Sequence, residues 1–217
     1  MKIFLDTADI NEIKSLSKTG LIDGVTTNPS LILKSGKDFL DTIDKICKII
    51  DGPVSAEVTQ VDFDKMLKEA KILSSISEKV AVKVPLTEQG LNVCYELSKK
   101  NIMVNVTLCF SSSQAILAAK AGAKFISPFW GRLDDISQNG QILISEIIQI
   151  YKNYNFKTEV LVASIRNPQQ VVESAKLGSD IVTIPTKVFN QLYKHPLTDS
   201  GLEIFINDFK KTKQSIL

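Results

Sequence analysis

Short apolar runs recur along the chain, and each ends at a polar residue and is followed by a stretch with helical spacing of apolar positions. This alternation is typical of βα units that build a parallel sheet. The predicted strands cover residues 2–5, 24–26, 54–57, 80–84, 103–107, 125–127, 159–163 and 181–184. Helical spacing occurs at 10–17, 39–50, 63–74, 111–121, 142–151 and 168–176. About eight strands close a (β/α)8 barrel, so we expect residues 1–217 to form one TIM-barrel domain of the α/β class.

A further helix is predicted at 198–215, with Leu202, Phe205, Ile206 and Phe209 on one apolar stripe. Such a stripe needs to be buried, either against the same barrel or against a neighbouring subunit. The competing architecture for the whole chain is an open, doubly wound sheet, which usually has a Gly-rich phosphate loop after an early strand. Here the first strand runs instead into the string DTAD, which contains no glycine.

Composition narrows the classes of function. The chain is 44% hydrophobic and 23% charged with a net charge of +2, as in an ordinary soluble domain. It has one His, His195, and its only Arg residues are Arg132 and Arg166. This scarcity excludes a His-based catalytic triad, a His-rich metal site and an Arg-rich nucleic-acid surface. A general preference for Lys explains the shortage of Arg, and the two retained Arg then mark places that need a planar guanidinium.

The cysteines and the N-terminal segment indicate in which cellular compartment the protein is expected. Cys47, Cys94 and Cys109 are scattered without a CxxC pair, which predicts neither a disulfide framework nor a zinc site. Asp6 interrupts any signal-peptide core, and no apolar run approaches the roughly 20 residues of a membrane helix. We therefore expect a cytoplasmic protein with no membrane or nucleic-acid partner.

The reactive face of a TIM barrel lies at the carboxyl ends of its strands. Among the residues predicted there, Lys83 is the strongest candidate for a catalytic residue. It lies within the apolar string VAVKVP, whereas most other Lys residues lie in polar helical stretches. Burial disfavours an ammonium and lowers a Lys pKa from about 10.4. The neutral amine can form a Schiff base with a ketone. The alternative is a Lys that extends to solvent or forms a structural ion pair with Glu57 or Asp6.

Two carboxylates at strand ends, Asp6 and Glu57, suit proton transfer because no His is available for it. Asp6 followed by Thr7 is also a common kind of helix N-cap. A capping role fits Glu57 less well, because residues 58–60 look extended before a new helix begins near Asp62.

Other strand ends carry groups suited to sugars and phosphates. The string TTNPS at 26–30 has hydroxyls and an amide that could hold sugar hydroxyls, although it equally predicts a turn and a helix start. Arg132, Ser164 and Arg166 follow the sixth and seventh strands and together resemble a phosphate site. The alternative for the two Arg is a pair of surface ion pairs.

These segments together resemble the transaldolase family, in particular its short bacterial and archaeal branch, which also contains fructose-6-phosphate aldolases. The resemblance covers essentially the whole chain, and it is carried by the strings FLDTA, GVTTNPS, VKVP, NVT, SPF with Arg132, and ASIR. It implies that Lys83 forms the Schiff base and that Asp6 is the acid/base for the substrate hydroxyl. Glu57 and Thr107 would hold and activate the water. The protonated imine is the electron sink, so this chemistry needs neither a metal nor an organic cofactor.

The resemblance also implies the substrate contacts. These are Thr26, Asn28, Asn105, Ser127, Phe129, Arg132, Ser164 and Arg166. The two Asn would bind hydroxyls of the dihydroxyacetone unit, the two Arg with Ser164 would bind the sugar phosphate, and Thr26 and Ser127 would line the site.

Two positions separate the activities within the family. Aldolase members have Gln at the place of Glu57 and Tyr at that of Phe129, so both positions here resemble transaldolase. We expect transfer of dihydroxyacetone from sedoheptulose 7-phosphate to glyceraldehyde 3-phosphate, giving erythrose 4-phosphate and fructose 6-phosphate in the non-oxidative pentose phosphate pathway. The alternatives are a fructose-6-phosphate aldolase and a non-catalytic sugar-phosphate-binding barrel. Members of the branch form pentamers that pair as decamers, so a homo-oligomer with the C-terminal helix on a neighbour is expected.

Overall fold

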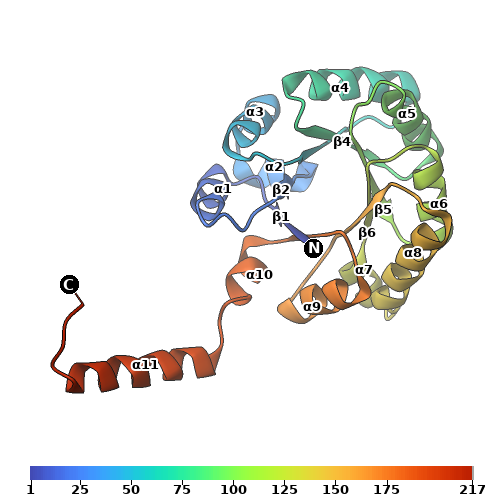
Figure 1. Cartoon of the computed structure of the whole chain (residues 1–217). Coiled ribbons are helices and arrows are strands. Elements are labelled where there is room, and N and C mark those ends of the chain that lie inside the picture. The colour runs from blue at the N-terminus through green and yellow to red at the C-terminus, as the bar shows by residue number, and fades with distance from the viewer. Residues whose placement is uncertain (217) are drawn as a thin grey trace.

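The computed structural model describes residues 1–216 and contains eight parallel strands closed into a barrel, with helices around the outside (Figure 1). Neighbours in sequence pair in order, and the last strand pairs with the first. The strands are β1 (Lys2–Asp6), β2 (Gly24–Thr26), β3 (Val54–Glu57), β4 (Val80–Pro85), β5 (Val104–Cys109), β6 (Phe125–Pro128), β7 (Glu159–Val162) and β8 (Ile181–Ile184). The predicted (β/α)8 barrel is therefore confirmed.

The helices follow the strands in the expected alternation. They are α1 (Ile10–Ser17), α2 (Pro29–Ser35), α3 (Phe39–Ile49), α4 (Phe63–Ile76), α5 (Glu88–Ser98), α6 (Ser112–Lys120), α7 (Trp130–Asp134), α8 (Gly140–Tyr154), α9 (Pro168–Leu177), α10 (Thr186–Gln191) and α11 (Pro196–Lys211). The ranges predicted as helical did not include α5, α7 and α10, and α2 was expected only as a possible helix start at 26–30. Three of these have seven residues or fewer, which is too short for a helical period to stand out. No helix within residues 1–216 is long and apolar enough to cross a membrane.

Several predicted boundaries differ from those of the structure by one to four residues, as for α8, which covers Gly140–Tyr154 rather than 142–151, and two of the differences have a visible local cause. The fifth strand runs two residues beyond Thr107, because the chain passes through an irregular register in which Leu108 has a φ of +60°. The C-terminal helix covers Pro196–Lys211 rather than 198–215. It begins early because Pro196 suits the first helical position and His195 Nδ1 accepts a hydrogen bond from Leu197 N.

The barrel lumen has an apolar floor. Its members are Phe4, Ala81, Phe125, Leu161 and Ile181, with Met103 packed against them. The Phe4 and Phe125 rings come from β1 and β6, and their centroids are 6.2 Å apart in an edge-to-face contact, so the two side chains meet across the lumen. The larger core lies between the outer faces of the strands and the helices, and it contains side chains such as Ile43, Ile46 and Ile147.

Polar side chains stand directly above this floor. Successive residues of a strand point to opposite faces, so the residue two positions after each floor residue also points into the lumen. Asp6 follows Phe4, Lys83 follows Ala81, Asn105 follows Met103, Ser127 follows Phe125, and Thr183 follows Ile181. The strand period therefore places a polar layer on top of an apolar one, at the carboxyl end of the barrel.

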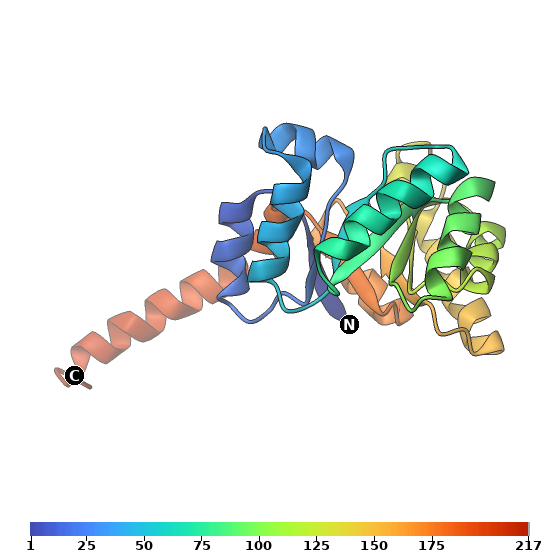
Figure 2. The ribbon, with the colours of Figure 1, turned by 90° about the horizontal axis from the view of Figure 1, so that it is seen from above.

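The C-terminal helix does not pack on this barrel. It projects away from the other elements (Figures 1 and 2), and none of its residues is buried. Leu202, Phe205, Ile206 and Phe209 of the predicted stripe are all exposed, Phe205 to 74%. The expectation that the same barrel could cover the stripe is therefore wrong for this chain.

Gly24→Ala is expected to lower the free energy of unfolding by about 1–3 kcal/mol. Its Cβ would lie 2.6 Å from the Phe4 ring and 2.7 Å from the Pro53 carbonyl oxygen. Gly201→Ala in α11 is the matched control, because nothing lies within 4 Å of that Cβ. Chemical denaturation of both variants measures the difference. A Gly24→Ala protein as stable as the parent would contradict the close packing of Phe4 against β2.

Candidate active site

A cavity of about 570 Å³ opens at the carboxyl ends of the strands. All the predicted site residues except Asn105 line it. Those in its wall are Asp6, Thr26, Asn28, Glu57, Lys83, Thr107, Ser127, Phe129, Arg132, Ser164 and Arg166. The carboxyl ends of β1 to β7 thus bring residues that are far apart in the sequence to the same cavity.

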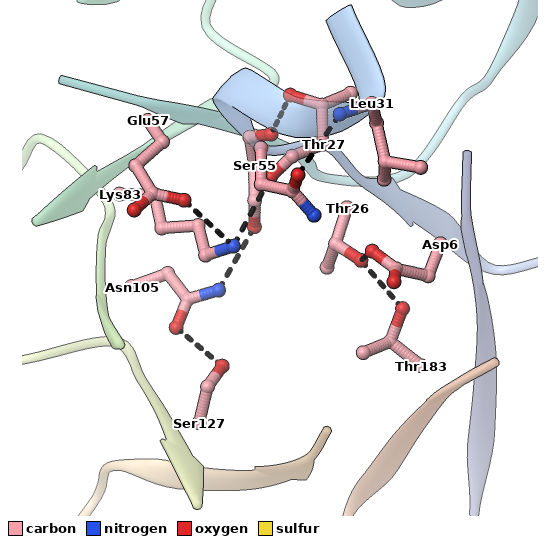
Figure 3. A network of polar contacts seen from close by, with 11 residues as sticks. Asp6, Thr26, Thr27, Leu31, Ser55, Glu57, Lys83, Asn105, Ser127 and Thr183 are labelled. Carbon is pink, nitrogen blue, oxygen red and sulfur yellow. Dashed lines mark hydrogen bonds and ion pairs between the residues drawn. The ribbon is translucent and has the colours of Figure 1, made fainter. Parts of the chain in front are cut away.

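Lys83 lies in the cavity wall beside a carboxylate. Its side chain is 7% exposed, and Nζ lies 3.0 Å from Glu57 Oε2 and donates to the Thr27 carbonyl oxygen at 3.1 Å (Figure 3). Glu57 and Lys83 are register partners on β3 and β4, so the strand pairing itself sets this contact. The ion pair considered as the alternative for Lys83 is therefore present, and it lies inside the cavity rather than on the surface.

Asp6 lies across the lumen from this pair (Figure 3). Thr26 Oγ1 donates to Asp6 Oδ1 at 2.8 Å. Burial raises the pKa of Asp6 above its usual 3.8, while the Lys83 charge and the Thr26 hydrogen bond act in the opposite direction. The alternative role for Asp6 as the cap of the following helix is wrong, because Asp9 accepts the hydrogen bonds of the first turn of α1.

Asn105 lies within the polar layer and is held from both sides. Its Nδ2 donates to Ser55 Oγ at 3.0 Å, and Ser127 Oγ donates to its Oδ1 at 2.8 Å. These two hydrogen bonds determine the positions of Oδ1 and Nδ2 in the Asn105 carboxamide. Thr107 Oγ1 is also buried, and among residues 1–216 it has no hydrogen-bond partner. Thr107 lines the cavity, and no group among residues 1–216 uses its hydroxyl.

Asn28 combines two roles. Its Oδ1 accepts a hydrogen bond from Leu31 N at 3.0 Å, so it caps α2 as the helix-start alternative predicted. It also lines the cavity, and its amide nitrogen is not used by the cap. The segment 26–30 is therefore both a helix start and part of the wall.

The cationic end of the cavity is built by α7, which follows β6, and by the segment between β7 and α9. The Arg132 guanidinium lies 5.0 Å from the centre of the Phe129 ring, and Arg166 Nη2 donates to Asp135 Oδ2 at 2.9 Å. Gly131 makes room for Arg166, since a Cβ there would lie 2.6 Å from Arg166 Nε. Ser164 has a φ of +61°, and its carbonyl oxygen accepts from Gly131 N. The ion-pair alternative thus holds for Arg166, and both Arg still face the same cavity.

Comparison with known proteins agrees with this geometry. Residues 3–216 match the family model described as Transaldolase/Fructose-6-phosphate aldolase. The chain is 59% identical over 216 residues to a protein of Chelativorans sp., covering 100% of both. It is 55% identical over 210 residues to one of Methanococcus maripaludis, covering 97% of this chain and 98% of that one. Both relatives are named "Probable transaldolase".

The chain belongs to the transaldolase/fructose-6-phosphate aldolase family. In this family member, Phe129 supplies an aromatic wall without a hydroxyl, and its ring packs edge-to-face on Phe110 at 5.6 Å. His195, the single His of the chain, is not among the residues that line the cavity. Within residues 1–216 no cluster of three His, Cys, Asp or Glu side chains is placed to hold a metal ion.

Sequence reasoning missed three residues that shape the site, namely Ser55, Gly131 and Thr183. Ser55 and Thr183 lie on the lumen face, and Thr183 is part of the cavity wall. The strand period contained the signal for both, since Ser55 precedes Glu57 by two residues and Thr183 follows a floor residue by two. Nothing in the sequence marked Gly131, because its role depends on the path of the Arg166 side chain.

Asp6→Asn is expected to stabilise the fold by about 1 kcal/mol at neutral pH. The native state holds the Asp6 proton more tightly than the unfolded chain, so wild-type stability falls as pH rises through the raised pKa. The Asn variant does not lose stability in this way as pH rises. Its higher stability relative to the parent should therefore disappear on acidification. Thermal denaturation at about pH 4 and 7 tests this, with exposed Asp64→Asn as the control. A variant less stable than the parent at neutral pH would contradict burial as the dominant effect.

Proposed function

We propose that this protein is a transaldolase of the non-oxidative pentose phosphate pathway. It transfers a dihydroxyacetone unit from sedoheptulose 7-phosphate to glyceraldehyde 3-phosphate and gives erythrose 4-phosphate and fructose 6-phosphate. The observation that carries the proposal is a buried Lys83 in a cavity wall, with a carboxylate 3.0 Å from its Nζ and a second carboxylate across the lumen.

Formation of the Schiff base uses the first carboxylate. Glu57 takes a proton from Lys83 Nζ, and the neutral amine attacks the ketone carbonyl. One proton then passes from the nitrogen to the alkoxide oxygen, which gives a carbinolamine. The hydroxyl of the carbinolamine leaves as water when Glu57 returns the proton, and the nitrogen lone pair forms the iminium. Thr107 Oγ1, free of other partners among residues 1–216, holds the water during this step and during hydrolysis.

Carbon–carbon cleavage uses the second carboxylate. Asp6 takes the proton of the substrate hydroxyl adjacent to the scissile bond, the bond breaks, and its electron pair passes into the iminium to form an enamine. The aldose product leaves. The enamine then attacks the acceptor aldehyde, and Asp6 returns the proton to the new hydroxyl, which leaves the product as an iminium on Lys83. Water adds to this iminium, and collapse of the carbinolamine releases the product ketose and the Lys83 amine.

The remaining predicted residues fit recognition of a ketose phosphate. Asn28 and Ser127 line the cavity and suit the hydroxyls of the dihydroxyacetone unit, and Thr26 is part of the same wall. Asn105 does not line the cavity, and its contact with the same unit is proposed through the amide proton that Ser55 does not use. Arg132, Ser164 and Arg166 suit the phosphate, since guanidinium groups donate paired hydrogen bonds to its oxygens. The sugar chain then runs from the cationic end of the cavity to Lys83.

Phe129 favours transfer over release of free dihydroxyacetone. Its ring has no hydroxyl with which to position a water against the enamine, so the enamine persists until an aldehyde arrives. Rates of fructose 6-phosphate cleavage with and without erythrose 4-phosphate separate the two activities. Faster cleavage without the acceptor would favour the aldolase alternative.

The proposal also covers the cellular compartment, the domain organisation and the oligomeric state of the enzyme. We place it in the cytoplasm as a single barrel domain, in a pentamer or a decamer. The exposed apolar stripe of α11 supports assembly, because an unpaired Phe205 and its neighbours would gain by burial against another subunit. Light scattering of the purified protein measures the size, and a monomer would contradict this part of the proposal.

Borohydride reduction in the presence of fructose 6-phosphate is expected to attach the sugar irreversibly to Lys83, because reduction of the iminium leaves a stable amine. Peptide mass analysis locates the adduct. Lys83→Arg should give no adduct, and Lys99→Arg, an exposed Lys on the outer surface, should react as the parent does. Absence of an adduct on Lys83 in the parent would overturn the mechanism and favour a non-catalytic barrel.

Arg166→Lys keeps the charge and loses the planar pair of donors. We expect KM for phosphorylated substrates to rise about tenfold, the equivalent of one charge-assisted hydrogen bond. KM for unphosphorylated fructose should not change, and this substrate is the internal control. Equal losses for both substrates would show that Arg166 is not a phosphate ligand.

A further inference from the structure

Thr183 of β8 is a buried hydroxyl that the proposed mechanism does not use. It is 3% exposed and lines the cavity. Its Oγ1 lies 2.6 Å from Thr26 Oγ1, which in turn contacts Asp6 (Figure 3). Thr26 is on β2 and Thr183 on β8, and β1 lies between these two strands in the sheet. The two hydroxyls therefore meet inside the lumen, next to the Asp6 carboxyl.

The donors in this chain of three groups can be assigned by counting protons. As the base of the proposed function Asp6 is ionised and only accepts, so Thr26 uses its single hydroxyl proton on Asp6 Oδ1 at 2.8 Å. Thr26 then has no proton left for the second contact. The 2.6 Å contact is consequently a hydrogen bond in which Thr183 donates to Thr26.

This direction has two consequences for Asp6. A hydroxyl that accepts a hydrogen bond becomes a stronger donor, so Thr183 strengthens the bond from Thr26 to the carboxylate. It also prevents Thr26 from rotating its proton towards Thr183 and away from Asp6. Oδ1 is thereby occupied, and Oδ2 is the oxygen left for the substrate.

We infer that Thr183 is a positioning residue, which acts through Thr26 to hold the Asp6 carboxylate ionised and with Oδ2 presented to the substrate hydroxyl. The inference rests on the acid/base role of Asp6 in the proposed function. Within residues 1–216, the Thr183 hydroxyl forms its hydrogen bond with Thr26 and none with Asp6 or Lys83.

The other influences on Asp6 set the direction of the expected change. Burial raises its pKa, and Lys83 on β4, itself paired with Glu57 on β3, lowers it together with the Thr26 hydrogen bond. Loss of the Thr183 hydroxyl weakens one of the two lowering effects, so the pKa of Asp6 should rise further. Because Asp6 acts as a base in cleavage, the acidic limb of the rate profile should move to higher pH.

The test is the pH dependence of kcat/KM for fructose 6-phosphate with erythrose 4-phosphate as acceptor. Thr183→Val, which keeps the shape and removes the donor, should move the acidic limb up by about half a pH unit. That shift is roughly a threefold loss on the limb, with the plateau nearly unchanged. Thr183→Ser should restore the parent profile. Thr26→Val, which removes the direct bond, should move the limb by more than Thr183→Val does.

Thr158→Val is the matched control for the loss of a buried hydroxyl. Thr158 Oγ1 donates to the Ala123 carbonyl oxygen at 2.7 Å, outside the cavity wall. This variant should lose stability and keep the acidic limb of the parent. Thr183→Ala serves as a second variant if the Val protein does not fold.

The outcomes are distinct. An acidic limb that stays in place in the Thr183 variants, or one that Ser does not restore, overturns the inference. Failure of the proposed function looks different, because the parent protein itself would then give neither transfer activity nor a borohydride adduct on Lys83.

Discussion

Closure of the sheet is the constraint on which the rest of this structure depends. In a closed barrel every second side chain of all the strands points into one lumen, where bulk water enters only through the mouth. Polar groups placed there have to find partners among themselves. Most of them do so in three small sets: Lys83 with Glu57, Asp6 with Thr26 and Thr183, and Asn105 with Ser55 and Ser127. Thr107 Oγ1 is the exception among residues 1–216.

This arrangement lowers the stability of the fold, and it holds the reactive groups in place before substrate binds. A buried carboxyl and a buried ammonium are costly to remove from water, and the apolar floor and the outer core have to offset that cost. In return the reactive groups are carried by strands, whose pairing fixes their spacing before any substrate arrives. The register of Glu57 with Lys83 shows this most directly, because two neighbouring backbone positions set the distance between an acid and a base.

The strands were predictable because each is a short apolar run with a polar end, and the lumen face follows from their period of two. Lys83 stood out because it interrupts an apolar string, and Arg132 and Arg166 because Arg is rare in this chain. Short helices such as α7 and α10 gave no periodic signal. Asp6 could not be separated from a helix cap until Asp9 was seen to fill that role.

By itself, the sequence determined the barrel, the family resemblance and the set of residues at the strand ends, since these depend on local periodicity and on residue type. Tertiary structure alone decided which of these residues touch. The contact of Thr183 with Thr26, more than 150 positions apart, exists only because closure brings β8 beside β1. It also decided that α11 projects away from its own barrel, because an apolar stripe indicates that a helix has a face to bury and not which surface covers that face.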